Sequence, residues 1–215
     1  MKNTEFYIVR HGESLGNATK TYVGHTNVDL SEHGYAQAKI TAEHLRAVPF
    51  DAIYSSDLLR AHNTAVPHAQ IHGLSIVDSV DLREVFLGDW EGYTVEQLLS
   101  EYHEEFTVKW KGEFGSYTLP NGESVCHAAC RFYDKLLEIA KENEGKTVLI
   151  TAHAAVIRAF WCKINGVTPL EDWGAAFPFP TNASYSKCAF DGEKFIPREY
   201  SCDSHFKEED ITHVE

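Results

Sequence analysis

"FYIVRHGESLGN", residues 6–17, stands almost at the start of the chain and joins an apolar run to charged and polar residues. The run Phe6 to Val9 predicts a short buried strand, which leads directly into Arg10, His11 and Gly12. An ordinary turn needs neither the guanidinium nor the imidazole, whereas a phosphate site uses both. In open α/β sheets, ligands bind outside the carboxyl ends of the strands, so this strand end is a candidate binding site.

Two further strand ends carry similar side chains. "KTVLITAH", residues 146–153, is the clearest buried strand of the sequence and ends at His153. "DAIYSS", residues 51–56, predicts another strand, and Arg60 lies in the first turn of the helix that follows it. Each residue taken singly is more simply explained as packed or solvated. Together they predict two arginines and two histidines around one crevice, where free backbone N–H groups at the helix starts also favour anions.

Strand and helix patterns alternate along the chain. Helices are expected at residues 31–48, 57–70, 94–110, 124–143 and 154–164, and further strands at 74–80, 183–190 and 194–200. The last two strands are expected to form a hairpin around Asp191 and Gly192. This alternation is typical of a largely parallel sheet with helices on both faces, so we predict an α/β three-layer sandwich.

Local signals predict how the helices begin, end and face. Ser31 and Asp57 are expected to be N-caps, and Thr94 with Gln97 a capping box. Pro67 is expected to kink or stop its helix. The inward faces are expected to include Ala36, Ile40 and Leu45 in one helix and Cys130, Leu137 and Ala140 in another. The acidic tail, residues 207–215, is expected to fray.

The 215 residues are enough for one well-buried domain, and no repeat, low-complexity segment or clean linker divides them. We therefore predict a single domain over residues 1–215. The stretch 89–123 has the weakest regular pattern and is expected to form a cap over one edge of the sheet.

Composition excludes several classes of protein. The formal net charge of −13 argues against nucleic acid and against anionic membrane surfaces as partners, because both need a basic footprint. No apolar run is long enough to span a membrane, and the polar N-terminus lacks a secretory segment, so a cytoplasmic protein is expected. The five cysteines contain no CxxC pair and are expected to be reduced thiols. A homodimer is compatible with the sequence.

The chain resembles the histidine phosphatase superfamily, the phosphoglycerate mutase-like group. The matching segments are RHGES with Asn17, DLSEHGYAQA, IYSSDLLRAHNTA, LREVFLGDWEGYT and LITAHAAVIRA, in the order of the family and across most of residues 6–160. Five ordered motifs make this resemblance specific. One departure follows His153, where the family commonly has Gly and this chain has Ala154; we expect the helix to start there in ordinary geometry.

The resemblance implies a role for each candidate residue. His11 matches the nucleophile that becomes phosphorylated, and Glu84 matches the proton donor to the leaving group. The phosphate pocket would comprise Arg10, Asn17, Arg60 and His153. These residue types suit the chemistry, because arginine forks bind phosphoryl oxygens and two nearby guanidiniums lower the pKa of His11, which must be neutral to attack phosphorus. Neither a metal nor another cofactor is expected, since this cluster supplies the charge and no HExxH motif is present.

The resemblance covers both phosphatases and mutases. A mutase must hold a bisphosphate and needs additional cations, but residues 94–123 contain Lys109 and Lys111 against six glutamates. We therefore expect a metal-independent hydrolase of phosphorylated small molecules. Phosphoglycerate mutase-type transfer and an inactive relative that binds phosphorylated ligands remain alternatives, whereas a dinucleotide site lacks its GxGxxG motif.

The aromatic residues of the same stretch also allow two interpretations. They fit either lid packing or an aromatic entrance to the site, and they are Tyr102, Phe106, Trp110, Phe114 and Tyr117. The identity of the substrate is not readable from the sequence.

Overall fold

A six-stranded sheet forms the middle layer of the computed structural model, which describes residues 2–110, 115–167 and 176–212. The strand order is β3-β2-β4-β1-β5-β6. The strands are β1 (Thr4–Arg10), β2 (Ala52–Ser56), β3 (Ile76–Ser79), β4 (Thr147–Ala152), β5 (Tyr185–Phe190) and β6 (Phe195–Cys202). The first four strands run parallel, and β5 and β6 form the expected antiparallel hairpin at one edge.

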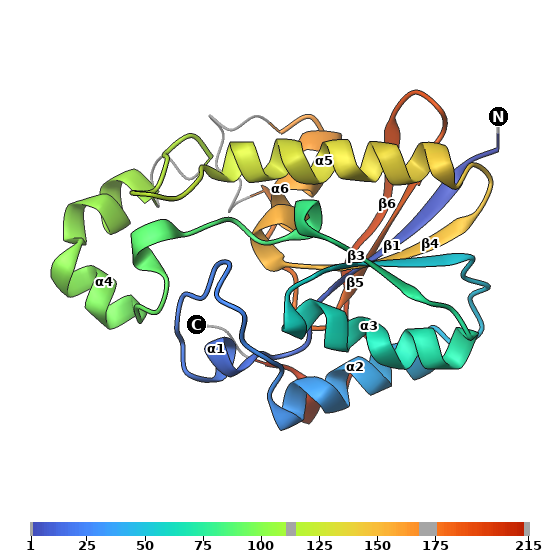
Figure 1. Ribbon diagram of the computed structural model, residues 1–215, viewed down its shortest axis with the longest axis horizontal. Coiled ribbons are helices and arrows are strands. Elements are labelled where there is room, and N and C mark those ends of the chain that lie inside the picture. The colour runs from blue at the N-terminus through green and yellow to red at the C-terminus, as the bar shows by residue number, and fades with distance from the viewer. Residues whose placement is uncertain (1, 111–114, 168–175, 213–215) are drawn as a thin grey trace.

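Helices cover both faces of this sheet (Figure 1). One face carries α2 (Glu32–His44) and α3 (Leu59–His72), and the other carries α5 (Val125–Glu142) and α6 (Ala154–Ile164). Successive side chains of the central strand β1 point to opposite faces of the sheet. Ile8 packs in the hydrophobic core on one face and Val9 in the core on the other. Central strands buried on both faces are continuously apolar, which explains the runs seen in the sequence. The α/β sandwich is confirmed.

The segment between β3 and α5 extends beyond the sheet, at the left of Figure 1. It contains the short 3₁₀ turns η1 (Val80–Leu82) and η2 (Gly88–Trp90), then α4 (Val95–Glu101) and the π-helical turn η3 (Glu105–Trp110). The Thr94 capping box is confirmed. The single helix expected over residues 94–110 is wrong, because α4 ends at Glu101 and η3 follows in a wider winding.

Aromatic packing explains most of this stretch. The Trp90 ring lies 5.7 Å from that of Phe106 and 5.9 Å from that of Trp110, and all three side chains are buried. Tyr102 and Tyr117 pack against the same core from partly buried positions, whereas Phe114 lies outside the described residues. The described aromatic residues therefore act as packing.

Tertiary contacts overturned several local expectations for α2 and α5. Ala36 is exposed, because α2 turns Gly34, Gln37, Ala38, Thr41 and Ala42 inward. That face is small and polar because it binds backbone: Thr41 Oγ1 donates to Ala183 O at 2.9 Å. Cys130 is exposed as well, while Leu45 and Ala140 are buried as expected and Ile40 and Leu137 are partly buried.

The expected N-cap of α3 and the expected stop at Pro67 were also wrong. Its N-cap is Leu58, without a side-chain hydrogen bond, because the Asp57 carboxylate instead accepts from Arg83 Nε at 2.7 Å and Nη2 at 2.5 Å. Pro67 lies inside the helix, which continues to His72. The buried face on either side of Pro67 packs against the sheet and offsets the one missing backbone hydrogen bond.

The expectation that the acidic tail frays is wrong for residues 207–212, which make hydrogen bonds within the tail and to the rest of the protein. Residues Glu208–Asp210 form the 3₁₀ turn η4, and Gln37 Nε2 donates to Asp210 O at 2.8 Å and to Thr212 Oγ1 at 3.0 Å. Thr212 Oγ1 in turn donates to Glu13 Oε2 at 3.0 Å. None of the helices that the structure describes is long and apolar enough to cross a membrane.

Candidate active site

His11 follows β1 at the carboxyl end of the sheet. Its backbone N–H donates to Ala152 O at the end of β4, at 2.9 Å, so the pairing of the two strands continues to the histidine. The ring Nδ1 lies 2.7 Å from Gly12 O. Because a carbonyl oxygen can only accept, Nδ1 carries the proton and Nε2 keeps its lone pair. The ring is therefore held in the tautomer that a nucleophile requires.

Glycines allow the loop after His11 to pass close to α2. A Cβ added to Gly12 would lie 2.5 Å from Gly34 O, and a Cβ on Gly34 would clash with Glu13 O. Gly12 N also donates to Thr64 Oγ1 on α3, at 3.0 Å. This close approach explains why Gly directly follows the histidine in the sequence.

His153 lies at the end of β4 and occupies the N-cap position of α6. Its ring is fully buried, 5.1 Å from the His11 ring between centroids, and its Nε2 lies 2.8 Å from Ser56 Oγ at the end of β2. Its Nδ1 has no hydrogen-bond partner among the described residues. The ends of the adjacent strands β2, β4 and β1 thus meet at one site, as the sequence predicted.

Arg10 and Arg60 are both buried beside these histidines, 6% and 1% exposed. Arg10 Nη1 donates to Pro180 O at 2.6 Å, and Arg60 donates to Thr26 O at 3.0 Å and Gly24 O at 2.7 Å. The Nε of each arginine has no partner within the described part of the chain. Burial lowers the pKa of each guanidinium to about 10, so both stay charged at neutral pH. Among the described residues, the two guanidiniums hydrogen-bond to backbone carbonyls, and carboxylates act on them only electrostatically. Buried cations in such surroundings favour an anionic ligand.

The same environment keeps the histidines neutral. Burial, followed by the charges of Arg60 and Arg10, lowers the pKa of His11 well below its ordinary value. Burial and Arg60 do the same for His153. At neutral pH, His11 Nε2 is therefore an unprotonated nitrogen beside two permanent positive charges.

The Glu84 carboxylate reaches the N-terminus of α6. Its Oε2 accepts from Ala155 N at 3.1 Å, and its Oε1 accepts from Val156 N at 3.3 Å and Val85 N at 2.9 Å. It acts electrostatically on both arginines, which places it at the same site. Ala154 begins α6 without a positive φ, so the ordinary geometry expected there is confirmed.

Two other carboxylates of the same loop bond to other segments, although Glu91 also acts electrostatically on Arg60. Asp89 accepts from Asn121 Nδ2 at 3.0 Å. Glu91 accepts from His25 N and from Thr26 Oγ1, each at 2.6 Å. Glu84 is accordingly the carboxylate of this loop that meets the helix start beside His153.

Asn17 lies in the short helix α1 (Leu15–Ala18), and hydrogen bonds to its side-chain oxygen fix the orientation of its amide. The Oδ1 atom accepts from Ser14 N at 3.1 Å, from Ser14 Oγ at 3.0 Å and from Asn182 Nδ2 at 3.2 Å. The opposite end of the amide, Nδ2, is then the donor left for a ligand.

Sequence reasoning missed two polar partners in the site. Asn182, fully buried, also donates from Nδ2 to His11 O at 3.0 Å. It lies 171 residues after His11, and no local signal marks it. Ser56, which contacts His153, ends a predicted strand, and that position was the available signal.

The buried donors of the site suit an anionic ligand. The unpartnered donors of the site surround a neutral histidine nitrogen, and no cluster of three or more His, Cys, Asp or Glu side chains suited to a metal occurs in the described ranges. The arrangement fits a phosphoryl group held by guanidiniums within reach of a nitrogen nucleophile.

Comparison with known proteins agrees with this geometry. The sequence model of the histidine phosphatase superfamily (branch 1) matches residues 6–203. Phosphoserine phosphatase 1 of Hydrogenobacter thermophilus is 34% identical over 179 residues, which cover 83% of each chain. The 2,3-bisphosphoglycerate-dependent phosphoglycerate mutase 2 of Gloeobacter violaceus is 30% identical over 169 residues, 75% of this chain and 76% of the mutase.

A solved structure extends the similarity to the fold. YhfR of Bacillus stearothermophilus superimposes with a TM-score of 0.88 and is 29% identical, covering 94% of this chain and 98% of its own. The match of the family model runs from β1 through the terminal hairpin and includes every residue of the site described above. The chain belongs to the histidine phosphatase superfamily, branch 1.

Proposed function

We propose that this protein is a phosphatase that hydrolyses phosphate monoesters of small molecules through a phosphohistidine on His11 Nε2. The observation that carries the proposal is the His11 ring: Nδ1 bonds to Gly12 O, which leaves Nε2 unprotonated beside two buried guanidiniums. A nucleophile and a phosphate-binding cluster thus occupy one site, as phosphoryl transfer requires.

In the first step, His11 Nε2 attacks phosphorus while the bond from phosphorus to the ester oxygen breaks. Arg10, Arg60, His153 and Asn17 would hold the phosphoryl oxygens. Glu84 would give its proton to the leaving oxygen, which departs as an alcohol. The ester itself is the source of that proton, since a phosphate monoester has a second pKa of about 6 and binds partly as the monoanion. A bound phosphate also disfavours a second negative charge beside it.

In the second step, a water molecule attacks the phosphohistidine. The Glu84 carboxylate would take a proton from this water, and the bond between phosphorus and Nε2 breaks to release inorganic phosphate. His11 returns to the neutral form that its buried surroundings favour.

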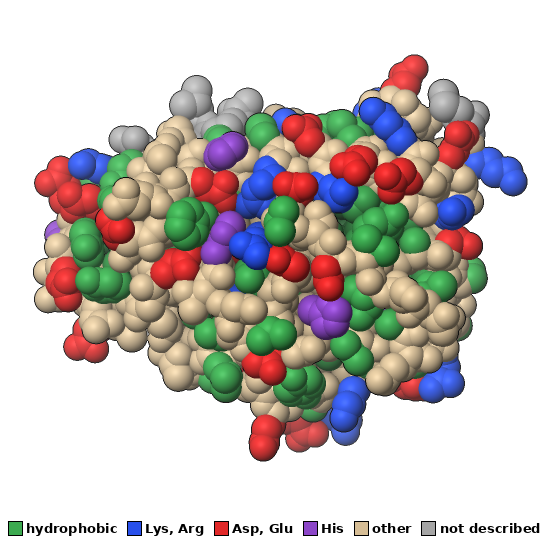
Figure 2. All heavy atoms as spheres, in the orientation of Figure 1, with side chains coloured by type: hydrophobic (Ala, Val, Ile, Leu, Met, Phe, Trp, Pro, Cys, Tyr) green, Lys and Arg blue, Asp and Glu red, His purple; other side chains and the backbone are tan. Residues whose placement is uncertain are grey.

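Surface charge supports hydrolysis over mutase-type transfer. In Figure 2, acidic side chains gather over the α4 end of the molecule, where Glu96, Glu101 and Glu104 are exposed. Among the described residues of 94–123, Lys109 is the sole lysine or arginine. A bisphosphate would meet repulsion there rather than a second set of cations.

We also propose that residues 1–215 form one domain and that residues 89–123 form a cap over one edge of the sheet. The support is the continuous core that joins Trp90 and Phe106 of this segment to Phe132 and Phe160 of the sheet-covering helices. Residues 111–114 of the proposed cap lie outside the described part.

The test is a screen of phosphate monoesters, with release of inorganic phosphate measured in the presence and absence of EDTA. The set includes p-nitrophenyl phosphate and O-phosphoserine, the latter because the relative from H. thermophilus is a phosphoserine phosphatase. We expect turnover that EDTA leaves unchanged, since Arg10 and Arg60 supply the positive charge. Activity lost in EDTA and restored by a divalent metal would refute metal independence.

Two further assays separate the alternatives. Conversion of 3-phosphoglycerate to 2-phosphoglycerate with 2,3-bisphosphoglycerate, faster than hydrolysis of any monoester, would identify a mutase. Binding of phosphate without any turnover would identify an inactive relative.

A further inference from the structure

Arg131 extends from α5 to the loop that carries Glu84. Its Nη1 donates to Asp81 O at 2.9 Å and Arg83 O at 3.1 Å, with Val80 O at 3.5 Å. Its Nη2 donates to Glu84 O at 3.1 Å and to Glu123 Oε1 at 2.8 Å. One guanidinium, 19% exposed, thus binds several carbonyls of a segment that has no sheet or α-helical hydrogen bonds of its own.

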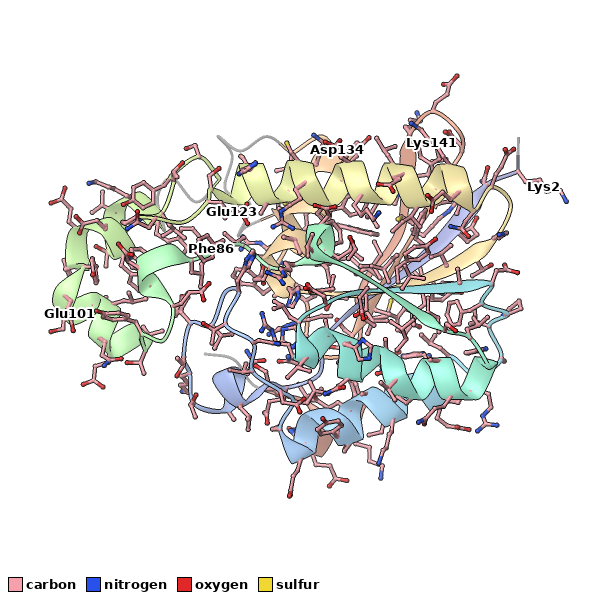
Figure 3. All side chains as sticks on the ribbon, viewed as in Figure 1. Lys2, Phe86, Glu101, Glu123, Asp134 and Lys141 are labelled. Atoms are coloured by element: carbon pink, nitrogen blue, oxygen red, sulfur yellow. The ribbon has the colours of Figure 1, made fainter. Side chains whose placement is uncertain are left out.

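Glu123 holds the other end of this segment. Phe86 N donates to Glu123 Oε1 at 2.9 Å, and Glu123 N donates to Phe86 O at 2.9 Å. Figure 3 shows Phe86 and Glu123 next to each other before the start of α5. The backbone on both sides of Glu84 is therefore tied to one ion pair, Arg131 with Glu123.

The backbone position of Glu84 matters because its carboxylate is held at the other end by Ala155 N and Val156 N. A shift of the loop would move the carboxylate relative to the His11 and His153 rings. Proton transfer requires hydrogen-bond distance to the leaving oxygen, and a displacement of about 1 Å can cost roughly 10²-fold in rate.

We infer that Arg131 is a positioning residue, which with Glu123 holds Glu84 where it can exchange a proton with the leaving group. This inference rests on the proposed phosphatase function. The forked geometry is essential to it: one ammonium in place of the guanidinium keeps the charge but cannot reach this set of acceptors.

The experiment compares kcat on an alkyl ester, O-phosphoserine or another that the wild type hydrolyses, with kcat on p-nitrophenyl phosphate. The variants are Arg131→Met, Arg131→Lys and Glu123→Gln. Lys135→Met is the matched control, because Lys135 lies one turn further along α5 and pairs with Glu138 at 2.9 Å, away from the Glu84 loop.

We expect Arg131→Met to lose about 10- to 10²-fold more on the alkyl ester than on p-nitrophenyl phosphate, whose leaving group hardly needs a proton. Glu123→Gln should shift the ratio in the same direction. Arg131→Lys should restore only part of the loss, and the control should stay within about twofold of wild type. Equal losses on both substrates would overturn the inference, because they indicate a purely structural role.

A double-mutant cycle gives a second test. If Arg131 acts through Glu84, adding Arg131→Met to Glu84→Gln should change the alkyl rate by less than about twofold. Independent, multiplied losses would overturn the inference. Thermal melting identifies any variant that fails to fold, and Arg131→Lys with Glu123→Gln then carry the test. Failure of the phosphatase proposal is distinguishable, since it appears as a wild type without turnover or phosphohistidine.

Discussion

At the scale of single residues, a backbone carbonyl fixes the tautomer of the His11 ring and leaves its Nε2 with a lone pair. Replacing His11 with Ala should abolish turnover, to below about one hundredth of wild type, because a catalytic unit fails almost completely without its nucleophile. The fold should persist, since the strand pairing of His11 involves its backbone N–H.

Phosphate release, circular dichroism and mass spectrometry of acid-labile phosphate on the wild-type chain check this prediction. An active His11→Ala variant would remove His11 as the nucleophile.

Glu84 provides a test that depends on the leaving group. Glu84→Gln keeps the size of the side chain but offers one acceptor oxygen in place of two and cannot donate an acidic proton. Hydrolysis of an alkyl phosphate should therefore slow by about 10²-fold more than that of p-nitrophenyl phosphate. The phosphoenzyme should also persist longer, because the same residue would activate water in the second step.

Asp89→Asn is the control in the same loop, since Asp89 is exposed and bonds to Asn121. It should affect both substrates little and equally. If Glu84→Gln also slowed both substrates equally, the proton donor would have to be sought at Asp89 or Glu91.

At the scale of elements, the contact between α2 and the loop after β1 depends on two glycines. Gly34→Ala would push a methyl group against Glu13 O, and the backbone has to move because neither partner is a flexible side chain. We expect a loss of about 1–3 kcal/mol in the free energy of unfolding, as for overpacked sites. Activity should fall with it, because the displaced loop carries His11.

Denaturant unfolding and turnover of p-nitrophenyl phosphate measure the two effects. Ala36→Ser, on the exposed side of the same helix, should change the free energy of unfolding by less than about 0.5 kcal/mol. A stable and fully active Gly34→Ala protein would show that the loop accommodates the methyl group at no cost.

At the scale of the whole molecule, buried histidines make stability depend on pH. His68 on α3 is fully buried, neither ring nitrogen has a partner among the described residues, and burial followed by His72 lowers its pKa from 6.5 to about 3. As the pH falls, His68 is therefore protonated near pH 6.5 in the unfolded chain but only near pH 3 in the folded protein. Stability is complete above pH 6.5 and falls as the pH drops through this window.

Each pH unit below the ordinary value should cost about 1.4 kcal/mol for such a histidine. Melting temperatures from pH 7 to pH 4 should fall, and His68→Leu should make the fall shallower. His103→Leu is the control, because His103 is exposed, and it should leave the dependence of the melting temperature on pH unchanged. An identical slope in the His68 variant would mean that His68 does not contribute to the acid sensitivity.

Much of the site was predictable because its key residues lie next to regular elements. Periodicity located β1 and β4 and therefore placed His11 and His153 at strand ends, and the structure shows that these two strands are neighbours. Short-range capping at Ser31 and Thr94 was also readable, because each cap bonds to a backbone N–H three residues later.

Other features were decided by partners far along the chain. Asp57 has the residue type and position of an N-cap, but its carboxylate bonds to Arg83. Ala36 fits the pattern of an inward residue, but it is exposed because α2 turns another face inward, and Gln37 of that face binds the C-terminal segment. Propensity is a weak constraint, so a strong tertiary contact overrides it.

The sequence by itself determined the alternation of strands and helices, the residues at the strand ends and the types of side chain available for phosphate chemistry, because these follow from local periodicity and composition. Only the tertiary structure decided which carbonyl orients the His11 ring, how the two arginines are buried, and that Arg131 and Asn182 reach the site. The physical reason is that hydrogen-bond geometry and desolvation depend on groups that folding brings together from distant parts of the chain, and local sequence patterns do not predict these contacts.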